Sequence, residues 1–205
     1  MKRPAPALFA VVASLAASGC VLPTQFQSAR TVAPGTYELS TGLSTLYMPA
    51  PGDAGSYPIP SMELGIRAGL SDRWDVGVRF PVSTTSGTRL DAKLQALRSE
   101  KWDLAVAFGL VQPSSGLPLY AAFLADYSLT SHVRFYGAVD VLGVASPREG
   151  VWLAQGGLVL GCDLALGDSG FSLRPELGAH QMATFGALRS APHLGIGLAW
   201  SPRPR

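Results

Sequence analysis

The segment "GLSDRWDVGVRF", residues 69–80, combines a tight turn with a strand that has two chemically different faces. Every second residue from Trp74 to Phe80 is apolar, and Asp75, Gly77 and Arg79 lie between them. A period of two predicts a β-strand with one apolar and one polar face. The apolar face would cover a core in a soluble sandwich, whereas it would contact lipid in a membrane barrel.

Nine further segments show the same alternation between turn-forming residues, so the sequence predicts an all-β fold of about ten strands. Outside the N-terminal twenty residues there is no apolar run of 18, which excludes a membrane-spanning helix. A chain of strands that crosses a bilayer must form a closed barrel, because lipid cannot satisfy an open sheet edge. The predicted strands are residues 37–47, 62–69, 74–80, 89–96, 102–110, 119–127, 133–141, 152–164, 171–180 and 194–200.

The connections between these strands alternate in length. Those around Asp72, Ser99, Ser131 and Asp168 are short, and "SDRWDV" at 71–76 returns as "SEKWDL" at 99–104. Short turns at one end and long loops at the other are typical of transmembrane barrels. The longer connections are expected at 48–58, 112–117, 144–151 and 181–191.

The N-terminus has the features of an export signal. Two basic residues precede an apolar stretch that ends at "ASGC", so residues 1–19 are predicted to be a signal peptide. The four residues Ala17–Cys20 resemble a bacterial lipobox, which implies lipid attachment at Cys20 and sorting to the outer membrane. Residues 20–35 lack periodicity and are predicted to be a periplasmic linker.

Large rings recur at the short-turn end of the predicted strands, on their apolar face. This distribution favours an aromatic belt at the level of the lipid headgroups. Its predicted members are Tyr37, Trp74, Trp102, Tyr127, Phe171 and Trp200.

Residues 36–200 resemble the bacterial outer-membrane β-barrel class. The resemblance implies an antiparallel up-and-down transmembrane β-barrel in the outer membrane. Such barrels usually end in an aromatic residue, whereas here Trp200 is followed by a predicted C-terminal tail, residues 201–205. It also implies contact with outer-membrane lipid and help from the barrel-insertion machinery. An even number of strands would place the N-terminus and the short turns in the periplasm.

In such a barrel the polar faces line the lumen. Nine acids and six bases would then face inward, and we expect ion pairs to close most of the lumen. Inward glycines such as Gly65, Gly195 and Gly197 would leave room for long Arg and Glu side chains. The predicted lumen charges are Glu38, Glu63, Arg67, Asp75, Arg79, Arg89, Asp91, Lys93, Asp103, Asp126, Arg134, Asp140, Asp163, Arg174 and Glu176.

The sequence therefore favours a non-enzymatic outer-membrane barrel lipoprotein, structural or weakly pore-forming. Without Lys2 and Arg3 the chain has 14 basic and 14 acidic residues, which does not indicate nucleic-acid binding. No motif for a metal, a cofactor or a specific ligand is present. Two alternatives stay open: a lipid-tethered, soluble, lipocalin-like carrier of a small apolar ligand, and an enzyme that uses Asp140 and His180 near the outer rim.

Overall fold

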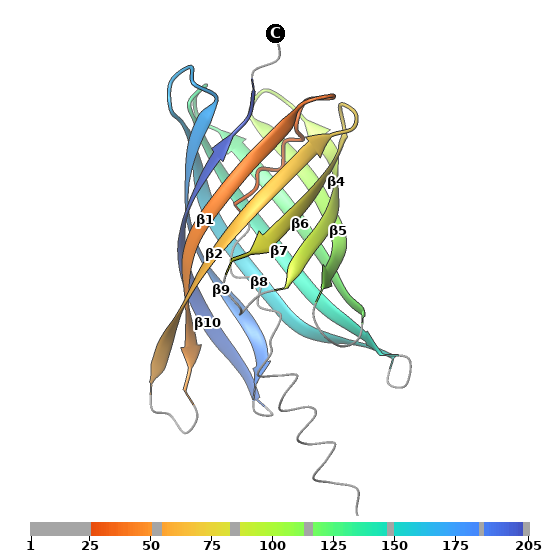
Figure 1. Ribbon diagram of the computed structural model, residues 1–205, viewed down its shortest axis with the longest axis vertical. Coiled ribbons are helices and arrows are strands. Elements are labelled where there is room, and N and C mark those ends of the chain that lie inside the picture. Colours follow the sequence, from red (N-terminus) through yellow and green to blue (C-terminus); the bar gives the residue numbers. More distant parts are fainter. Residues whose placement is uncertain are drawn as a thin grey trace, which may run out of the picture.

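The protein is a closed barrel of ten antiparallel strands. The computed structural model describes residues 26–50, 55–82, 87–112, 117–146, 150–184 and 187–202. Each strand pairs with the next one along the chain, and β1 pairs with β10 to close the barrel (Figure 1). This confirms the predicted all-β, up-and-down architecture. The strands are β1 (Tyr37–Pro49), β2 (Ser56–Gly69), β3 (Trp74–Pro81), β4 (Thr88–Arg98), β5 (Trp102–Gln112), β6 (Leu117–Ser128), β7 (Val133–Ser146), β8 (Gly150–Ala165), β9 (Phe171–Thr184) and β10 (Ala187–Trp200).

One end of the barrel, here called the turn end, carries the connections 70–73, 99–101, 129–132 and 166–170. The repeated sequence at these turns has a local cause. The hydroxyl of Ser71 accepts a hydrogen bond from the backbone N–H of Trp74 at 3.1 Å, and Ser99 accepts one from Trp102 at 2.9 Å. Thr130 closes the third turn in the same way. A hydroxyl three residues before the strand therefore fixes the turn and the start of the strand.

The opposite end, here called the extended end, differs from the sequence prediction. Long loops are expected there, but strands continue into most of those residues. Pro49 of β1 is still paired with Ser56 of β2, and Thr184 of β9 is paired with Ala187 of β10. The strand pairs protrude at this end (Figure 1). Backbone pairing does not require alternating side chains, which is why the sequence pattern ends before the strands do.

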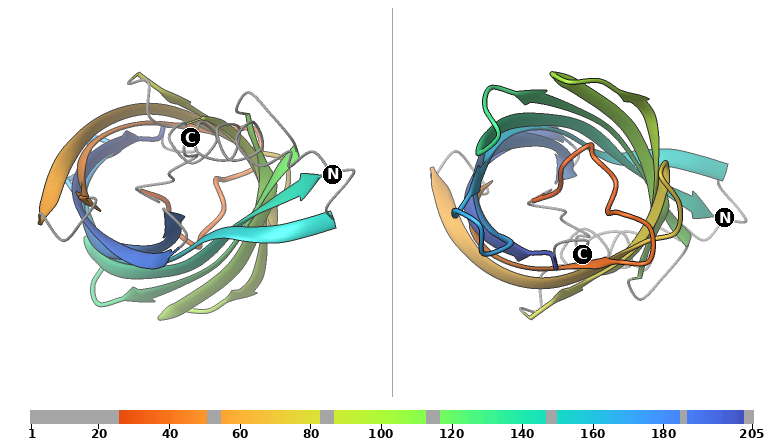
Figure 2. Two further views of the ribbon diagram at one scale, coloured as in Figure 1. Left: turned by 90° about the horizontal axis from the view of Figure 1, so that it is seen from below. Right: turned by 90° about the horizontal axis from the view of Figure 1, so that it is seen from above.

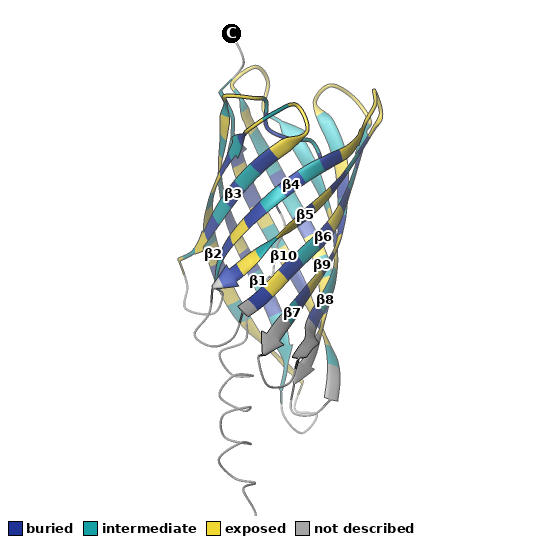
Figure 3. Ribbon diagram, turned by 90° about the vertical axis from the view of Figure 1, so that its right-hand side faces the viewer, coloured by how far each residue is buried: buried dark blue, intermediate teal, exposed yellow. Residues whose placement is uncertain are grey.

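The two faces of the barrel wall differ in polarity, as Figure 3 shows by the alternation of buried and exposed residues along each strand. Large apolar side chains point outward, among them Phe80, Phe123, Val139 and Leu158, each about half exposed. The inner face has two parts. An apolar wall on β5 to β8 comprises Ala105, Ala107, Val111, Tyr120, Ala122, Leu124, Ala138, Leu142 and Val159. A charged wall occupies the inner face of β2 to β4 and of β9.

The large rings of the predicted belt lie at the turn end. Tyr37, Trp74, Trp102 and Phe171 are exposed on the outer surface. Trp200 contacts Tyr37 with ring centroids 5.8 Å apart, and Trp102 contacts Tyr127 at 4.8 Å. Because β1 and β10 are neighbours, rings from the two ends of the barrel sequence form one continuous cluster.

Candidate functional site in the barrel lumen

Residues 26–33 lie inside the barrel, and we call them the lumen segment. Figure 2 shows this part of the chain crossing the interior in both views along the axis. Phe26, Gln27, Ala29 and Thr31 are each at most 5% exposed. A periplasmic linker is predicted over 20–35, whereas residues 26–33 of it lie in the lumen. Cys20 and the rest of residues 1–25 lie outside the described residues.

A turn at residues 33–36 connects the lumen segment to β1 at the turn end. The backbone N–H of Gly35 donates to the carbonyl of Gly69, and Gly69 N–H donates to the carbonyl of Thr36, both at 3.0 Å. Gly35 has a φ of 71°, which an L-residue with a side chain adopts at a cost. This glycine therefore allows the chain to leave the lumen and start the first strand within a few residues.

Three lumen carboxylates bind the backbone of the lumen segment. Glu176 accepts a hydrogen bond from Phe26 N–H at 2.7 Å, and Asp75 accepts one from Val32 N–H at 3.0 Å. Asp126 accepts one from Ala29 N–H at 2.8 Å and another from the Ser28 hydroxyl. A buried backbone outside helices and sheets needs such partners. Hydrogen bonds with a charged acceptor are the stronger kind.

Two cations bind carbonyl oxygens of the same segment. Lys93 Nζ donates to the carbonyls of Ser28 and Arg30, both at 2.8 Å, and Arg174 donates to the carbonyl of Phe26 at 2.8 Å. The segment also contributes a charge of its own, because Arg30 forms an ion pair with Asp103 at 2.9 Å. The barrel wall therefore binds both donors and acceptors of this backbone.

The ring of Phe26 packs against a surface made of glycine. A Cβ atom at Gly42 on β1, or at Gly195 or Gly197 on β10, would overlap the ring. Inward glycines such as Gly195 are expected to make room for Arg and Glu side chains, but at these positions an aromatic side chain fills the space. Ala29, further along the segment, packs against the apolar wall of β5 to β8.

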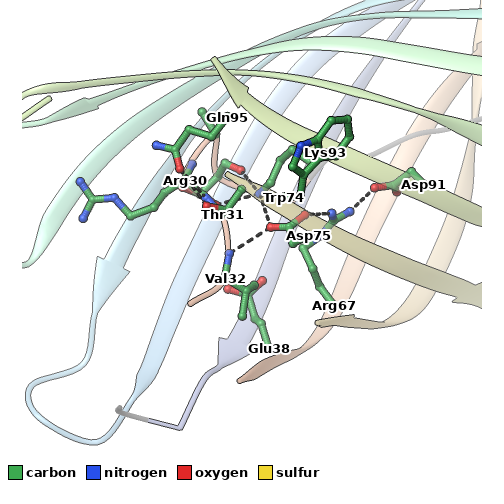
Figure 4. Close-up of polar contacts among 12 residues, drawn as sticks. Arg30, Thr31, Val32, Glu38, Arg67, Trp74, Asp75, Asp91, Lys93 and Gln95 are labelled. Carbon is green, nitrogen blue, oxygen red and sulfur yellow. Dashed lines mark hydrogen bonds and ion pairs between the residues drawn. The ribbon is translucent and has the colours of Figure 1, made fainter. Parts of the chain in front are cut away.

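The charged wall forms a connected series of ion pairs. Arg67 on β2 donates to Asp75 on β3 and to Asp91 on β4, and Asp75 in turn binds Val32 (Figure 4). Arg174 donates to Glu38 at 2.8 Å. The structure places the other predicted lumen charges on the inner face as well. Buried are Arg67, Asp75, Arg79, Arg89, Asp91, Lys93, Asp103, Asp126, Asp140, Arg174 and Glu176, and partly exposed are Glu38, Glu63, Arg134 and Asp163.

Two histidines and a glutamate form a directional chain of hydrogen bonds. His193 Nε2 lies 3.1 Å from Glu176 Oε1, so this nitrogen is the donor. His193 Nδ1 then accepts from His180 Nε2 at 3.1 Å, and His180 Nδ1 accepts from the Gln155 amide at 3.0 Å. Each of the four ring nitrogens thus takes part in one hydrogen bond, either as donor or as acceptor. The chain ends at the carboxylate that holds Phe26.

Of the pair considered for rim catalysis, His180 belongs to this chain of hydrogen bonds and Asp140 lies beside it. His180 and Asp140 are 3.9 Å apart and at most 1% exposed, within the lumen and not at its rim. In the part of the chain that the structure describes, no group of three potential ligands could hold a metal ion. Nor does any helix there have the length and hydrophobicity needed to cross a membrane. The local chemistry is that of a polar network that fixes a backbone segment.

Known proteins resemble this chain in fold but not in sequence. No family model and no curated protein matches the sequence. The structure is similar to that of the NanC porin, with a TM-score of 0.52 and 7% identity over 80% of this chain and 98% of that one. Neisserial surface protein A matches with a TM-score of 0.41, at 10% identity over 80% of this chain and 96% of its own. The outer membrane protease OmpT from Escherichia coli matches with a TM-score of 0.43, at 7% identity over 85% and 100%. By its fold, the chain resembles the class of outer-membrane β-barrels.

Digestion with trypsin tests whether Lys93 holds the lumen segment in place. In Lys93→Met two buried carbonyls lose a charged donor, which costs about 1–3 kcal/mol per hydrogen bond. The segment should open at least about tenfold more often, and cleavage after Arg30 should accelerate by the same factor. Intact mass of the cleaved barrel, starting at Thr31, measures this rate.

The matched control is Lys101→Met, which removes a lysine from the exposed turn between β4 and β5. It should be cleaved after Arg30 as slowly as the wild type. Equal cleavage rates in all three proteins would mean that Lys93 does not hold the segment.

Proposed function

We propose that the protein is a non-enzymatic outer-membrane β-barrel lipoprotein with a structural role, whose lumen is closed by its own residues 26–33. The observation that carries this proposal is the distribution of polarity. The outer face is apolar around the barrel, and the inner face holds a dense polar network bound to the lumen segment. A barrel with this polarity needs lipid outside.

The same distribution of polarity argues against the alternative of a soluble, lipocalin-like carrier of an apolar ligand. A soluble lipocalin-like barrel requires an apolar cavity and a polar surface. Here eleven buried charged residues of the strands line the interior, whereas Phe80, Val139 and Leu158 are about half exposed outside. An apolar ligand would have to displace charged hydrogen bonds in order to enter.

The position of the lumen segment favours a blocked lumen over an open pore. Its partners come from Asp75 and Lys93 on one side and from Glu176 and Arg174 on the other. An open path at this level would remove the hydrogen bonds that these four buried groups form with the segment. The proposal of a structural role follows from this closure.

The absence of catalysis is part of the proposal. The histidines that an acid–base mechanism would require are hydrogen-bonded to one another, to Gln155 and to Glu176. General acid–base catalysis requires such a group to reach a substrate. Both histidines are instead enclosed, at most 1% exposed.

The proposal also includes the membrane anchor and the orientation. The lipobox-like "ASGC" supports acylation of Cys20. The even number of strands places both ends of the barrel sequence, Tyr37 and Trp200, at the turn end, which supports a periplasmic position for this end. The ring cluster there would lie in the periplasmic headgroup region.

A charged substitution on the outer face tests whether this face contacts lipid. Val139 is 53% exposed near the middle of β7 and is paired with Phe123 and Leu158, both outward. Val139→Arg should cost roughly 2–4 kcal/mol in a bilayer. Urea titration of the protein folded in phosphatidylcholine vesicles measures the loss, and Val139→Leu should stay near the wild type. Equal stability of the Arg and Leu variants would argue against a lipid-facing position.

Planar-bilayer recordings should test closure of the lumen. The wild type should show no steady open level at neutral pH, because residues 26–33 occupy the lumen. A variant with these eight residues replaced by glycine and serine keeps the chain length, loses the side-chain contacts, and should open intermittently. Steady conductance of the wild type equal to that of the variant would contradict closure.

Cysteine labelling in whole cells should test the orientation. Ser131 lies in an exposed turn at the turn end, and Ser56 is exposed at the extended end. On a Cys162→Ser background, an impermeant maleimide should label Ser56→Cys and miss Ser131→Cys. Labelling of the Ser131 variant alone would reverse the proposed orientation.

A further inference from the structure

Two arginines lie opposite each other on the inner face of β3 and β4. Arg79 and Arg89 are Cα partners in this strand pair, and they are 7% and 1% exposed. Like charges directly opposite one another destabilise a sheet. A buried pair of this kind therefore requires compensating negative charge.

The three carboxylates on the same part of the barrel, strands β2 to β4, do not fully provide that charge. Glu63 pairs with Arg79 at 2.9 Å, and Asp75 is shared by Arg67 and Lys93. Asp91 is shared by Arg67 and Arg89. The buried cations of β2 to β4 are thus Arg67, Arg79, Arg89 and Lys93, against the three carboxylates Glu63, Asp75 and Asp91.

The excess positive charge coincides with unused donors on Arg89. Within the described residues, its Nε and Nη2 atoms are buried and have no hydrogen-bond partner. Asp91 Oδ2 is 3.2 Å from Nε but is itself without a hydrogen bond, so the two groups form an ion pair of poor geometry. Nε and Nη2 form one edge of the planar guanidinium, the kind of edge that binds two oxygens of an anion side by side.

The ring of Tyr120 contacts the guanidinium of Arg89. The guanidinium carbon lies 4.7 Å from the ring centroid, which is a cation–π contact. The ring contacts the guanidinium, and among the described residues the Nε and Nη2 donors keep no hydrogen-bond partner. Tyr120 therefore holds the group in place without consuming the donors.

The pair lies beyond the lumen segment, toward the extended end. On β4, Lys93 contacts the segment, and Arg89 is four residues away, about 13 Å along the strand. Arg79 is two residues from the end of β3, and Arg89 is one residue from the start of β4. The barrel wall is short here, since β3 has 8 residues while the other strands have 11 to 16 (Figure 3).

We propose that Arg79 and Arg89 form a binding site for one small oxyanion that enters from the extended end. The Nε and Nη2 edge of Arg89 binds two oxygens of the anion, and Arg79 adds charge from the opposite strand. This site goes beyond the structural role proposed above. It depends neither on the orientation of the barrel nor on its conductance.

Isothermal titration calorimetry of the folded full chain, in a nonionic detergent, tests the site with inorganic phosphate as the probe. Sodium chloride at equal ionic strength serves as the reference titrant. The wild type should bind one phosphate per barrel. Arg89→Gln should weaken binding by at least about tenfold, because the double hydrogen bond is lost.

Two further variants keep the test decisive. Asp91→Asn retains Arg89 and removes the competing carboxylate, so it should bind phosphate more tightly than the wild type. Lys101→Gln, in the exposed turn, should bind with unchanged affinity. Heat-modifiable gel migration verifies the fold of each variant. No phosphate-specific heat from the wild type, or Asp91→Asn binding no more tightly than the wild type, would overturn the proposal.

Discussion

The hydrogen bonds between lumen carboxylates and the backbone of residues 26–33 are the interaction on which the interior of this barrel depends. Buried carboxylates are stable only when donors surround them. The inner faces of the strands carry nine acids and six bases, so the wall alone cannot pair every acid. Backbone N–H groups of the lumen segment bind Asp75, Asp126 and Glu176, and its Arg30 pairs with Asp103. The segment thus completes the electrostatics of the wall while the wall satisfies the backbone of the segment.

The division of the lumen into a charged and an apolar wall gives the segment a defined orientation. Ala29 packs on the apolar wall of β5 to β8, and on the other side Lys93 binds the carbonyls of Ser28 and Arg30. The segment bends at Ala29 and Arg30. Residues 26–33 contact both walls at once, which a barrel with a uniform lumen would not specify.

The sequence was sufficient to predict the barrel and insufficient to predict what fills it. Alternation along ten segments determines strand number and facing, because a period of two leaves no freedom once one face is apolar. The segment "FQSARTVA" has no such period, because its partners are individual side chains on six different strands, β3 to β7 and β9. Two signals were present nonetheless: the surplus of inward acids, and the three inward glycines at 42, 195 and 197. The surplus required donors from elsewhere, and the glycines required a bulky group to fill the space.

The position of Phe26 has a consequence for the order of assembly. Its ring lies over Gly42 of β1 and over Gly195 and Gly197 of β10, and therefore spans the seam where the first strand joins the last. Joining strands about 160 residues apart costs roughly 4–5 kcal/mol in loop-closure entropy, more than any other pairing in this up-and-down barrel. A ring that contacts both strands offsets part of that cost, so seam closure and seating of the segment reinforce each other. Lateral separation of β1 from β10 would have to break the contacts of Phe26 as well as the backbone ladder.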